Sequence, residues 1–167
     1  MHLLLDYIGY YGPIILFSTT LILLRNMSKY LIFFIGGFIL NNILNILLKI
    51  FIKEPRPSTD QKAIEIGIVN GARIGFDKFG MPSGHAQNCA YCLGFITMVL
   101  NNPLITCLYT VITMITLAQR YINNNHSILQ LIVGTMTGLG FGYITYLSGK
   151  KYIIGAIKMK KDDNAPL

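Results

Sequence analysis

Residues 30–48 read YLIFFIGGFILNNILNILL, a run that contains no charged side chain. The hydrocarbon core of a bilayer is about 30 Å thick, and a helix that crosses it needs about 17–25 mainly apolar residues. The run has that length, so it predicts a transmembrane helix. Lys49 follows it directly, which places a cation at the end of this helix.

Apolar blocks of similar length recur on both sides of this run. The predicted membrane spans are Tyr7–Leu24, Tyr30–Leu48, Gly84–Leu100, Leu104–Ala118 and Ile128–Leu147. Of the 167 residues, 53% are hydrophobic and 13% are charged, whereas about 25% of residues in soluble domains are charged. We therefore predict an all-α, polytopic transmembrane helix bundle of about five spans. One membrane domain is expected over residues 1–147, followed by a basic, cytosolic tail over 148–167.

The charges favour a membrane partner over nucleic acid. The net charge is +7, but the basic residues flank the apolar blocks and form no continuous basic face. Anionic lipid headgroups are therefore the expected partner, and no nucleic acid is expected. The first block lacks a basic leader and a small-residue cleavage site, so we expect a retained helix and not a signal peptide.

Two of the three cysteines have a spacing that occurs in redox and metal-binding sites. Cys89 and Cys92 are separated like a redox or metal-binding pair, but both lie inside an apolar block. The sequence has no second such pair to complete a zinc site. We interpret them as small apolar side chains of a helix.

Polar residues suited to phosphate chemistry occur at three places. Lys49 and Arg56 follow the second block, residues 82–85 (PSGH) open the third, and Arg120 and His126 lie between the fourth and fifth. Counting crossings, the second and fourth blocks end on the face where the third and fifth begin. All three clusters are therefore expected on one side of the membrane.

The three cations match the charge of a phosphoryl group in transfer. That group spreads negative charge over three oxygens, so its transfer needs several fixed cations and donors. Lys49, Arg56 and Arg120 are available, and the planar fork of arginine can bind two phosphate oxygens. Taken singly, a cation at the end of a span is usually an interfacial anchor. The coincidence of all three clusters on one face favours a phosphate site.

The remaining polar residues supply an anion-binding helix end and two proton carriers. Ser83 stands where an N-cap belongs, with free backbone N–H groups at Gly84 and His85. Two histidines then remain for the two proton-dependent roles. One attacks phosphorus through a ring nitrogen and the other protonates the leaving oxygen.

These residues resemble the three signature motifs of the type 2 phosphatidic acid phosphatase superfamily, over residues 40–145. The matching motifs are Lys49-x6-Arg56-Pro57, Pro82-Ser83-Gly84-His85 and Arg120-x5-His126. The resemblance implies that His126 is the nucleophile and His85 the general acid. It also implies a site without metal or other cofactor, acting on a lipid phosphate. The phosphate-binding residues that it implies are Lys49, Arg56, Ser83, Gly84 and Arg120.

Two glutamines depart from the usual third motif. Gln119 stands in place of a serine, and Gln130 in place of an aspartate that would hold the imidazole of His126. Gln130 lies one helical turn after His126, so its carbonyl could accept the same N–H hydrogen bond without bringing a charge. A glutamine there, together with Gly80–Gln87 (GMPSGHAQ), is similar to the dolichyl-diphosphate phosphatase branch. That branch implies a polyprenyl diphosphate substrate at the lumenal face of the endoplasmic reticulum.

Two rival functions remain open from the sequence. A lipid phosphotransferase would use the same intermediate, and an inactive membrane scaffold would explain Gln119 and Gln130. The orientation follows from positive charge, which tends to stay cytoplasmic. The face without the motifs carries more of it, so the site is expected to face the lumen or exterior. Its basic residues are Arg25, Lys29, Lys150, Lys151, Lys158, Lys160 and Lys161.

Two periodic patterns predict how the helices pack. Asn41, Asn45 and Lys49 recur every fourth residue, either as hydrogen-bonding contacts between helices or as supports that orient Lys49. Gly134, Gly138 and Gly142 follow at the same step on the fifth block. Small residues at that spacing predict a close approach to another helix.

Overall fold

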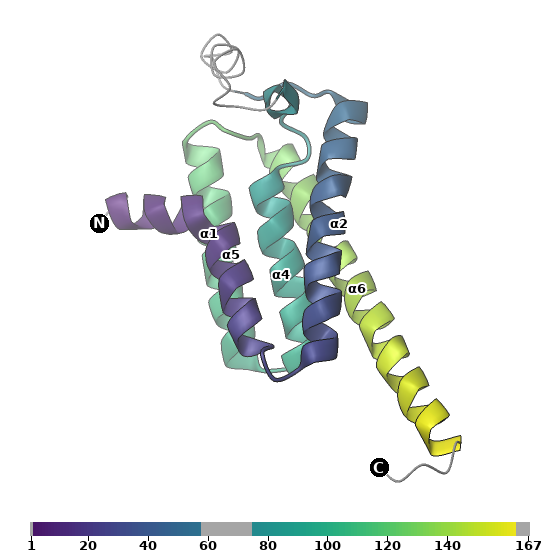
Figure 1. The fold of residues 1–167 in the computed structure, drawn as a ribbon. Coiled ribbons are helices and arrows are strands. Elements are labelled where there is room, and N and C mark those ends of the chain that lie inside the picture. The colour runs from purple at the N-terminus through teal and green to yellow at the C-terminus, as the bar shows by residue number, and fades with distance from the viewer. Residues whose placement is uncertain (1, 58–74, 163–167) are drawn as a thin grey trace.

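The computed structural model describes residues 2–57 and 75–162, and it is all-α as predicted. Each predicted block corresponds to one long helix, and a short 3-10 helix, η1, precedes the third block (Figure 1). The elements in chain order are α1 (His2–Leu23), α2 (Ser28–Ile52), η1 (Gly75–Lys78), α4 (Gly84–Leu100), α5 (Pro103–Ile122) and α6 (Ile128–Asp162).

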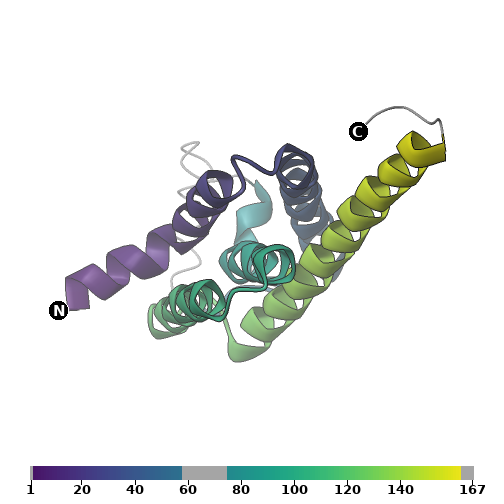
Figure 2. The same ribbon diagram turned by 90° about the horizontal axis from the view of Figure 1, so that it is seen from below.

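Helix α4 forms the centre of the bundle. It contacts α1, α2, α5 and α6, most extensively α6, and Figure 2 shows it enclosed by these four helices. Cys89 and Cys92 on this helix are buried within the apolar core, which is the environment expected of small apolar side chains.

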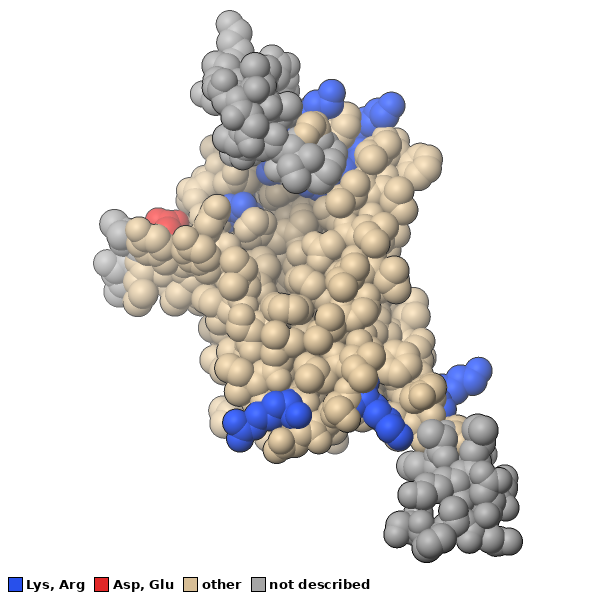
Figure 3. Space-filling view, viewed as in Figure 1, with Lys and Arg blue, Asp and Glu red and all other residues tan. Residues whose placement is uncertain are grey.

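Among the helices that the structure describes, three are long and apolar enough to cross a membrane: α2, α5 and residues Ile128–Gly155 of α6. Many large apolar side chains on their outward surfaces are exposed, Ile39 and Met136 among them. In Figure 3 the lysine and arginine side chains gather near the two ends of the bundle, and the surface between them carries almost no charged side chain. Such a belt is expected of helices whose outer faces contact lipid.

Two helices differ from the boundaries that the sequence suggested. The N-terminal part of α1 turns away from the rest of the helix (Figure 1), and Pro13 lies inside this helix. Proline removes a backbone donor and its ring clashes with the preceding turn, which bends a helix. Helix α6 continues to Asp162, so most of the segment predicted as a separate tail, 148–167, extends this helix.

Side-chain amides connect α2 to α4 inside the bundle. The Asn41 amide donates to Asn88 Oδ1 and the Asn45 amide donates to Gln87 Oε1, each over 2.8 Å. Gln87 in turn donates to Asn41 Oδ1 over 2.9 Å. Buried amides cost free energy unless they are paired. These contacts favour the interpretation of the polar pattern as hydrogen bonding between helices.

The glycines of α6 allow this helix to pack closely on α4, as predicted. A Cβ atom on Gly134 would lie 2.7 Å from the Ser83 carbonyl oxygen, and one on Gly142 would lie 2.7 Å from that of Tyr91. A Cβ atom on Gly138 would collide with the carbonyl oxygen of Gln87. At three successive turns of α6, a glycine therefore lies directly against the backbone of α4 or of its N-cap residue.

Replacing Gly138 with alanine is expected to destabilise the bundle by about 1–3 kcal/mol, because the added methyl group has no room. Gly140 provides the matched control on the same helix, since a Cβ atom there meets nothing within 4 Å. Thermal unfolding in detergent should show a lower midpoint for Gly138→Ala and an unchanged or higher one for Gly140→Ala. Equal midpoints for the two variants would contradict the close packing.

Candidate active site

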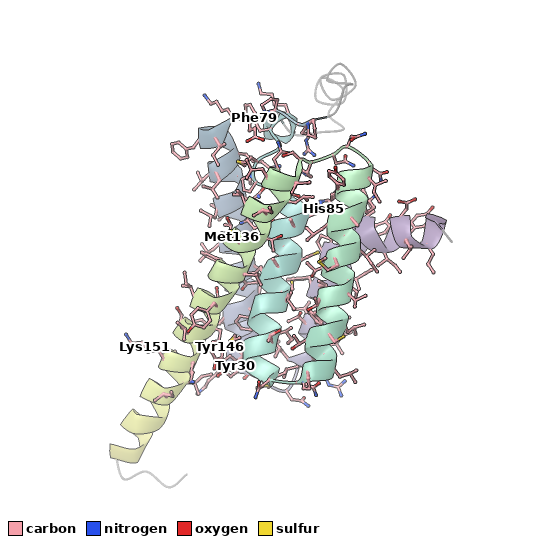
Figure 4. The ribbon with its side chains drawn as sticks, turned by 180° about the vertical axis from the view of Figure 1, so that it is seen from behind. Tyr30, Phe79, His85, Met136, Tyr146 and Lys151 are labelled. Carbon is pink, nitrogen blue, oxygen red and sulfur yellow. The ribbon has the colours of Figure 1, made fainter. Side chains whose placement is uncertain are left out.

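The ends of four helices bring the predicted site residues together. Helices α2 and α5 end, and α4 and α6 begin, at the same end of the bundle (Figure 1). Figure 4 shows His85 near that end of α4, with Phe79 beyond it. This is the arrangement expected from counting the membrane crossings.

A cavity of about 710 Å³ lies at this end of the bundle. Six of the eight predicted site residues line it: Lys49, Arg56, Gly84, His85, Arg120 and His126. Its wall also includes Tyr10 of α1 and Asn42 and Ile46 of α2. Figure 3 shows the surface hollowed between these two helices. The cavity therefore combines three cations and two imidazoles within the apolar bundle.

The cations are positioned by helix ends. Lys49 lies in the last turn of α2 and is 4% exposed, and the helix closes at Lys53 with a left-handed backbone, φ 53°. Arg120 lies in the last turn of α5 and is buried. Its Nη1 donates to Gln119 Oε1 over 3.3 Å. Gln119, which replaces the usual serine, thus contacts the guanidinium group next to it.

The hydrogen bonds around His126 determine which ring nitrogen carries the proton. The Gln130 Nε2 group faces two acceptors, Glu54 Oε1 at 2.8 Å and the Pro55 carbonyl at 2.9 Å. Gln130 Oε1 accepts the backbone N–H of Ser127 and lies 3.2 Å from His126 Nδ1. An amide oxygen can only accept, so Nδ1 carries the hydrogen and donates it.

The other ring nitrogen of His126 then has a free electron pair. Arg56 Nη1 lies 3.3 Å from His126 Nε2 and also donates to the Asn125 carbonyl over 3.3 Å. Because a guanidinium group only donates, Nε2 is an acceptor, as this tautomer requires. His126 is 3% exposed and lies on the cavity wall. The Nε2 electron pair is therefore held beside the Arg56 guanidinium at the cavity wall.

His85 is held from two sides. Arg120 Nη2 lies 3.3 Å from His85 Nδ1, so Nδ1 accepts and the proton of the neutral ring is on Nε2. The ring centroid of Tyr10 lies 6.0 Å from that of His85, and the Arg120 guanidinium lies 5.5 Å from the Tyr10 ring. Helix α1 therefore supports this part of the site through Tyr10.

Two predicted site residues lie behind the cavity wall. Ser83 is fully buried, and its Oγ accepts the backbone N–H of Ala86 over 3.4 Å as the N-cap of α4. Its own backbone N–H donates to the Gln130 carbonyl over 3.1 Å. Gln130 is 1% exposed and contacts His126 from below. Both residues therefore support the site from outside the cavity, and contact of Ser83 with phosphate stays a prediction.

Sequence reasoning missed Tyr10 and Glu54. Tyr10 lies in the first apolar block, whose composition gives no reason to assign it to a site. Glu54 could have been identified as a candidate, because it is a carboxylate between Lys49 and Arg56 in the first motif. Across residues 2–57 and 75–162, no three His, Cys, Asp or Glu side chains are grouped as metal ligands. The site without metal stays a prediction, which chelation tests.

His126 is expected to stay neutral through mildly acidic pH. Burial lowers its pKa from the usual 6.5 to about 3, and the Arg56 guanidinium acts in the same direction. Since protonation is disfavoured in the fold, His126 lowers stability as the pH falls from 6.5 toward 3. NMR of ¹⁵N-histidine-labelled protein, with His126→Gln for assignment, should show no titration of His126 between about pH 8 and 5. A midpoint near the usual value would contradict this environment.

Comparison with known proteins identifies the family. The model of the PAP2 superfamily matches residues 30–153. The chain is also 26% identical over 156 residues to the palmitoyl-protein thioesterase-dolichyl pyrophosphate phosphatase fusion 1 of Schizosaccharomyces pombe. That alignment covers 86% of this chain and 23% of the relative, so the chain spans about a quarter of that protein. No solved structure matches the chain.

The matched region contains all three polar clusters and the described helices α2, α4, α5 and most of α6. The match begins near the start of α2 and ends within α6, so it includes the residues of α2, α4 and α5 that line the cavity. The chain belongs to the PAP2 superfamily.

Proposed function

We propose that the chain is an integral membrane lipid phosphatase that works through a phosphohistidine at His126. The observation that carries this proposal is the environment of that ring. Gln130 accepts the Nδ1 proton, and the Nε2 electron pair lies beside Arg56 in the cavity. A nucleophile with a fixed tautomer next to phosphate-binding cations is the arrangement that phosphoryl transfer to histidine requires.

In the first step, His126 Nε2 attacks phosphorus and the bond from phosphorus to the leaving oxygen breaks. Lys49, Arg56 and Arg120 hold the phosphoryl oxygens, and the backbone N–H groups at the start of α4 add donors. The anionic substrate offsets the three positive charges and draws Arg120 toward its oxygens. His85 can then hold a second proton, which it gives to the leaving oxygen.

In the second step, water attacks the phosphohistidine and the bond from nitrogen to phosphorus breaks. His85, now neutral, accepts the proton of that water and returns to its starting state. Inorganic phosphate leaves, and His126 recovers its electron pair. The residues of this chain supply every proton transfer in the cycle, so the proposal includes no metal or other cofactor.

For the substrate, we propose a polyprenyl diphosphate of the dolichyl type, or a related lipid phosphate. The name of the fission yeast relative includes a dolichyl pyrophosphate phosphatase. The cavity lies where α2, a candidate membrane span, ends, and Ile46 of that helix forms part of its wall. A lipid with its headgroup at the membrane surface could reach such a cavity with its chain still in the bilayer.

We further propose that all five long helices belong to the membrane domain and that the site faces the lumen or exterior. In a eukaryote this would be the endoplasmic reticulum membrane. Arg25, Lys29, Lys150 and Lys151 are exposed at the end away from the cavity, and positive charge tends to remain cytoplasmic. That end, with the last turns of α6, would lie in the cytosol. On the cavity side, Lys53 and Lys78 are exposed, and Lys62 and Arg73 fall outside the described residues.

The test is phosphate release by the detergent-purified protein from a polyprenyl diphosphate and from phosphatidic acid, with EDTA present. We expect release from the diphosphate that EDTA does not reduce. With ³²P-labelled substrate and an added lipid alcohol, label that appears in the alcohol and not in phosphate would indicate a phosphotransferase. No turnover of either lipid would indicate the inactive scaffold.

A further inference from the structure

Glu54 contacts the glutamine that replaces the usual aspartate of the third motif. Its Oε1 accepts a hydrogen bond from Gln130 Nε2 over 2.8 Å, and Gln130 Oε1 lies 3.2 Å from His126 Nδ1. The amide of Gln130 thus stands between a carboxylate and the nucleophilic imidazole. The three side chains form a continuous series of hydrogen bonds from His126 to a negative charge.

The orientation of that amide is determined by its other partners. Nε2 also donates to the Pro55 carbonyl over 2.9 Å, and Oε1 also accepts the backbone N–H of Ser127 over 3.3 Å. A flipped amide would point its oxygen at two acceptors and its NH₂ group at a donor, which the partners forbid. The direction of donation therefore runs from His126 to Gln130 to Glu54.

The backbone around Glu54 is fixed as well. The carbonyl oxygen of Glu54 accepts the N–H of Gly80 over 2.7 Å, and Pro55 pairs with Phe79 as an isolated antiparallel bridge. A Cβ atom on Gly80 would collide with the Gln130 amide. The segments that precede Arg56 and Pro82 thus enclose Gln130 together.

We propose that Glu54 is a positioning residue that supplies, through Gln130, the negative charge that the usual aspartate of the motif would bring. This rests on the proposed function, in which His126 becomes positively charged as it is phosphorylated. Donation to a carboxylate polarises the amide and makes Oε1 a stronger acceptor for the Nδ1 proton. The negative charge of Glu54 thus acts on the imidazole of His126 through the intervening side-chain amide of Gln130.

The first test is Glu54→Gln, which keeps the shape and an acceptor oxygen but removes the charge. We expect kcat to fall about 10–100-fold with KM nearly unchanged, as for other residues that act through a bonded neighbour. Asp6→Asn is the matched control, since Asp6 is an exposed carboxylate on α1, and it should leave kcat unchanged. Full activity of Glu54→Gln would overturn the proposal.

A double variant separates this role from general support of the fold. Gln130→Asp alone places two carboxylates together and should reduce activity, because one of them must be protonated or displaced. Combined with Glu54→Gln, the aspartate contacts the imidazole directly and the new glutamine can donate to it. We expect the double variant to be more active than either single variant. Additive losses would contradict the charge-supplying role.

A spectroscopic measurement keeps this test independent of catalysis. In ¹⁵N-histidine NMR, the Nδ1 proton of His126 should move upfield in Glu54→Gln, because its acceptor is weaker, and should not move in Asp6→Asn. If the parent protein releases no phosphate but this shift occurs, the proposed function fails and the connection from Glu54 to His126 stands. If the parent is active and Glu54→Gln changes neither the shift nor kcat, only the role of Glu54 fails.

Discussion

The His126→Ala variant is expected to release phosphate about 10⁴-fold or more slowly than the parent protein, because it removes the atom that forms the covalent intermediate. His85, the other histidine of the cavity, does not replace it, because in the proposed cycle this ring protonates the leaving oxygen and then activates the water. The measurement is phosphate release from a polyprenyl diphosphate over a range of protein concentrations.

Controls separate lost chemistry from lost folding. His2→Ala changes a histidine at the start of α1 and should retain activity. The thermal midpoint of His126→Ala should show that the variant is folded, with a modest fall because the change leaves a cavity and removes a hydrogen-bond partner of Gln130. A folded His126→Ala variant with activity near that of the parent would contradict the assignment of the nucleophile.

The His85→Gln variant is expected to lose about 10²–10⁴-fold in kcat with phosphatidic acid, a phosphate monoester whose leaving oxygen is an alkoxide that needs a proton. The loss in the rate of His126 phosphorylation should shrink with p-nitrophenyl phosphate, because a nitrophenolate leaves without a proton. The measurement is the ratio of the parent and variant rates across leaving groups of different pKa.

This variant should also change which step limits the rate. With a good leaving group, phosphorylation of His126 stays fast, but water must then attack without its general base. Rapid mixing should show a burst of nitrophenolate close to one equivalent per protein, followed by slow turnover. Equal losses for good and poor leaving groups, with no burst, would contradict the role of His85.

The helices and their convergence were predictable because they depend on the length and order of apolar blocks. Leu104–Ala118 was recognised as a span although it lacks the full length, and α5 adds a turn at its C-terminal end. The crossing count then brought Lys49, His85 and His126 to one end. Hydropathy reports burial away from water, so it could not distinguish α4, buried in protein, from helices that face lipid.

The structure differs from the sequence-based prediction where the course or the end of a helix depends on packing or hydrogen bonding. Pro13 was visible in the sequence, but a proline in an apolar run does not state whether the helix bends or ends. The polar residues after Leu147 suggested a tail, yet α6 continues to Asp162, and several residues there, lysine, alanine and methionine among them, have favourable helix propensities.

Gln130 shows most clearly what the sequence could not decide. As a replacement for aspartate, it was compatible with a silenced site as well as with an active one. The structure places its oxygen on His126 and its nitrogen on Glu54. Glu54 is 76 residues away in sequence, and no local pattern connects the two. Contacts of this kind depend on the fold as a whole, whereas each motif residue could be identified from its residue type and its spacing in the sequence.

The most direct test of the central claim is to trap the intermediate. The parent protein is mixed with a lipid diphosphate labelled with ³²P at its terminal phosphate, quenched within milliseconds in alkali, and digested. We expect label on the peptide that contains His126, stable in alkali, lost in acid and absent from His126→Ala. Phosphate release without any labelled protein, or label that survives acid, would contradict the phosphohistidine mechanism.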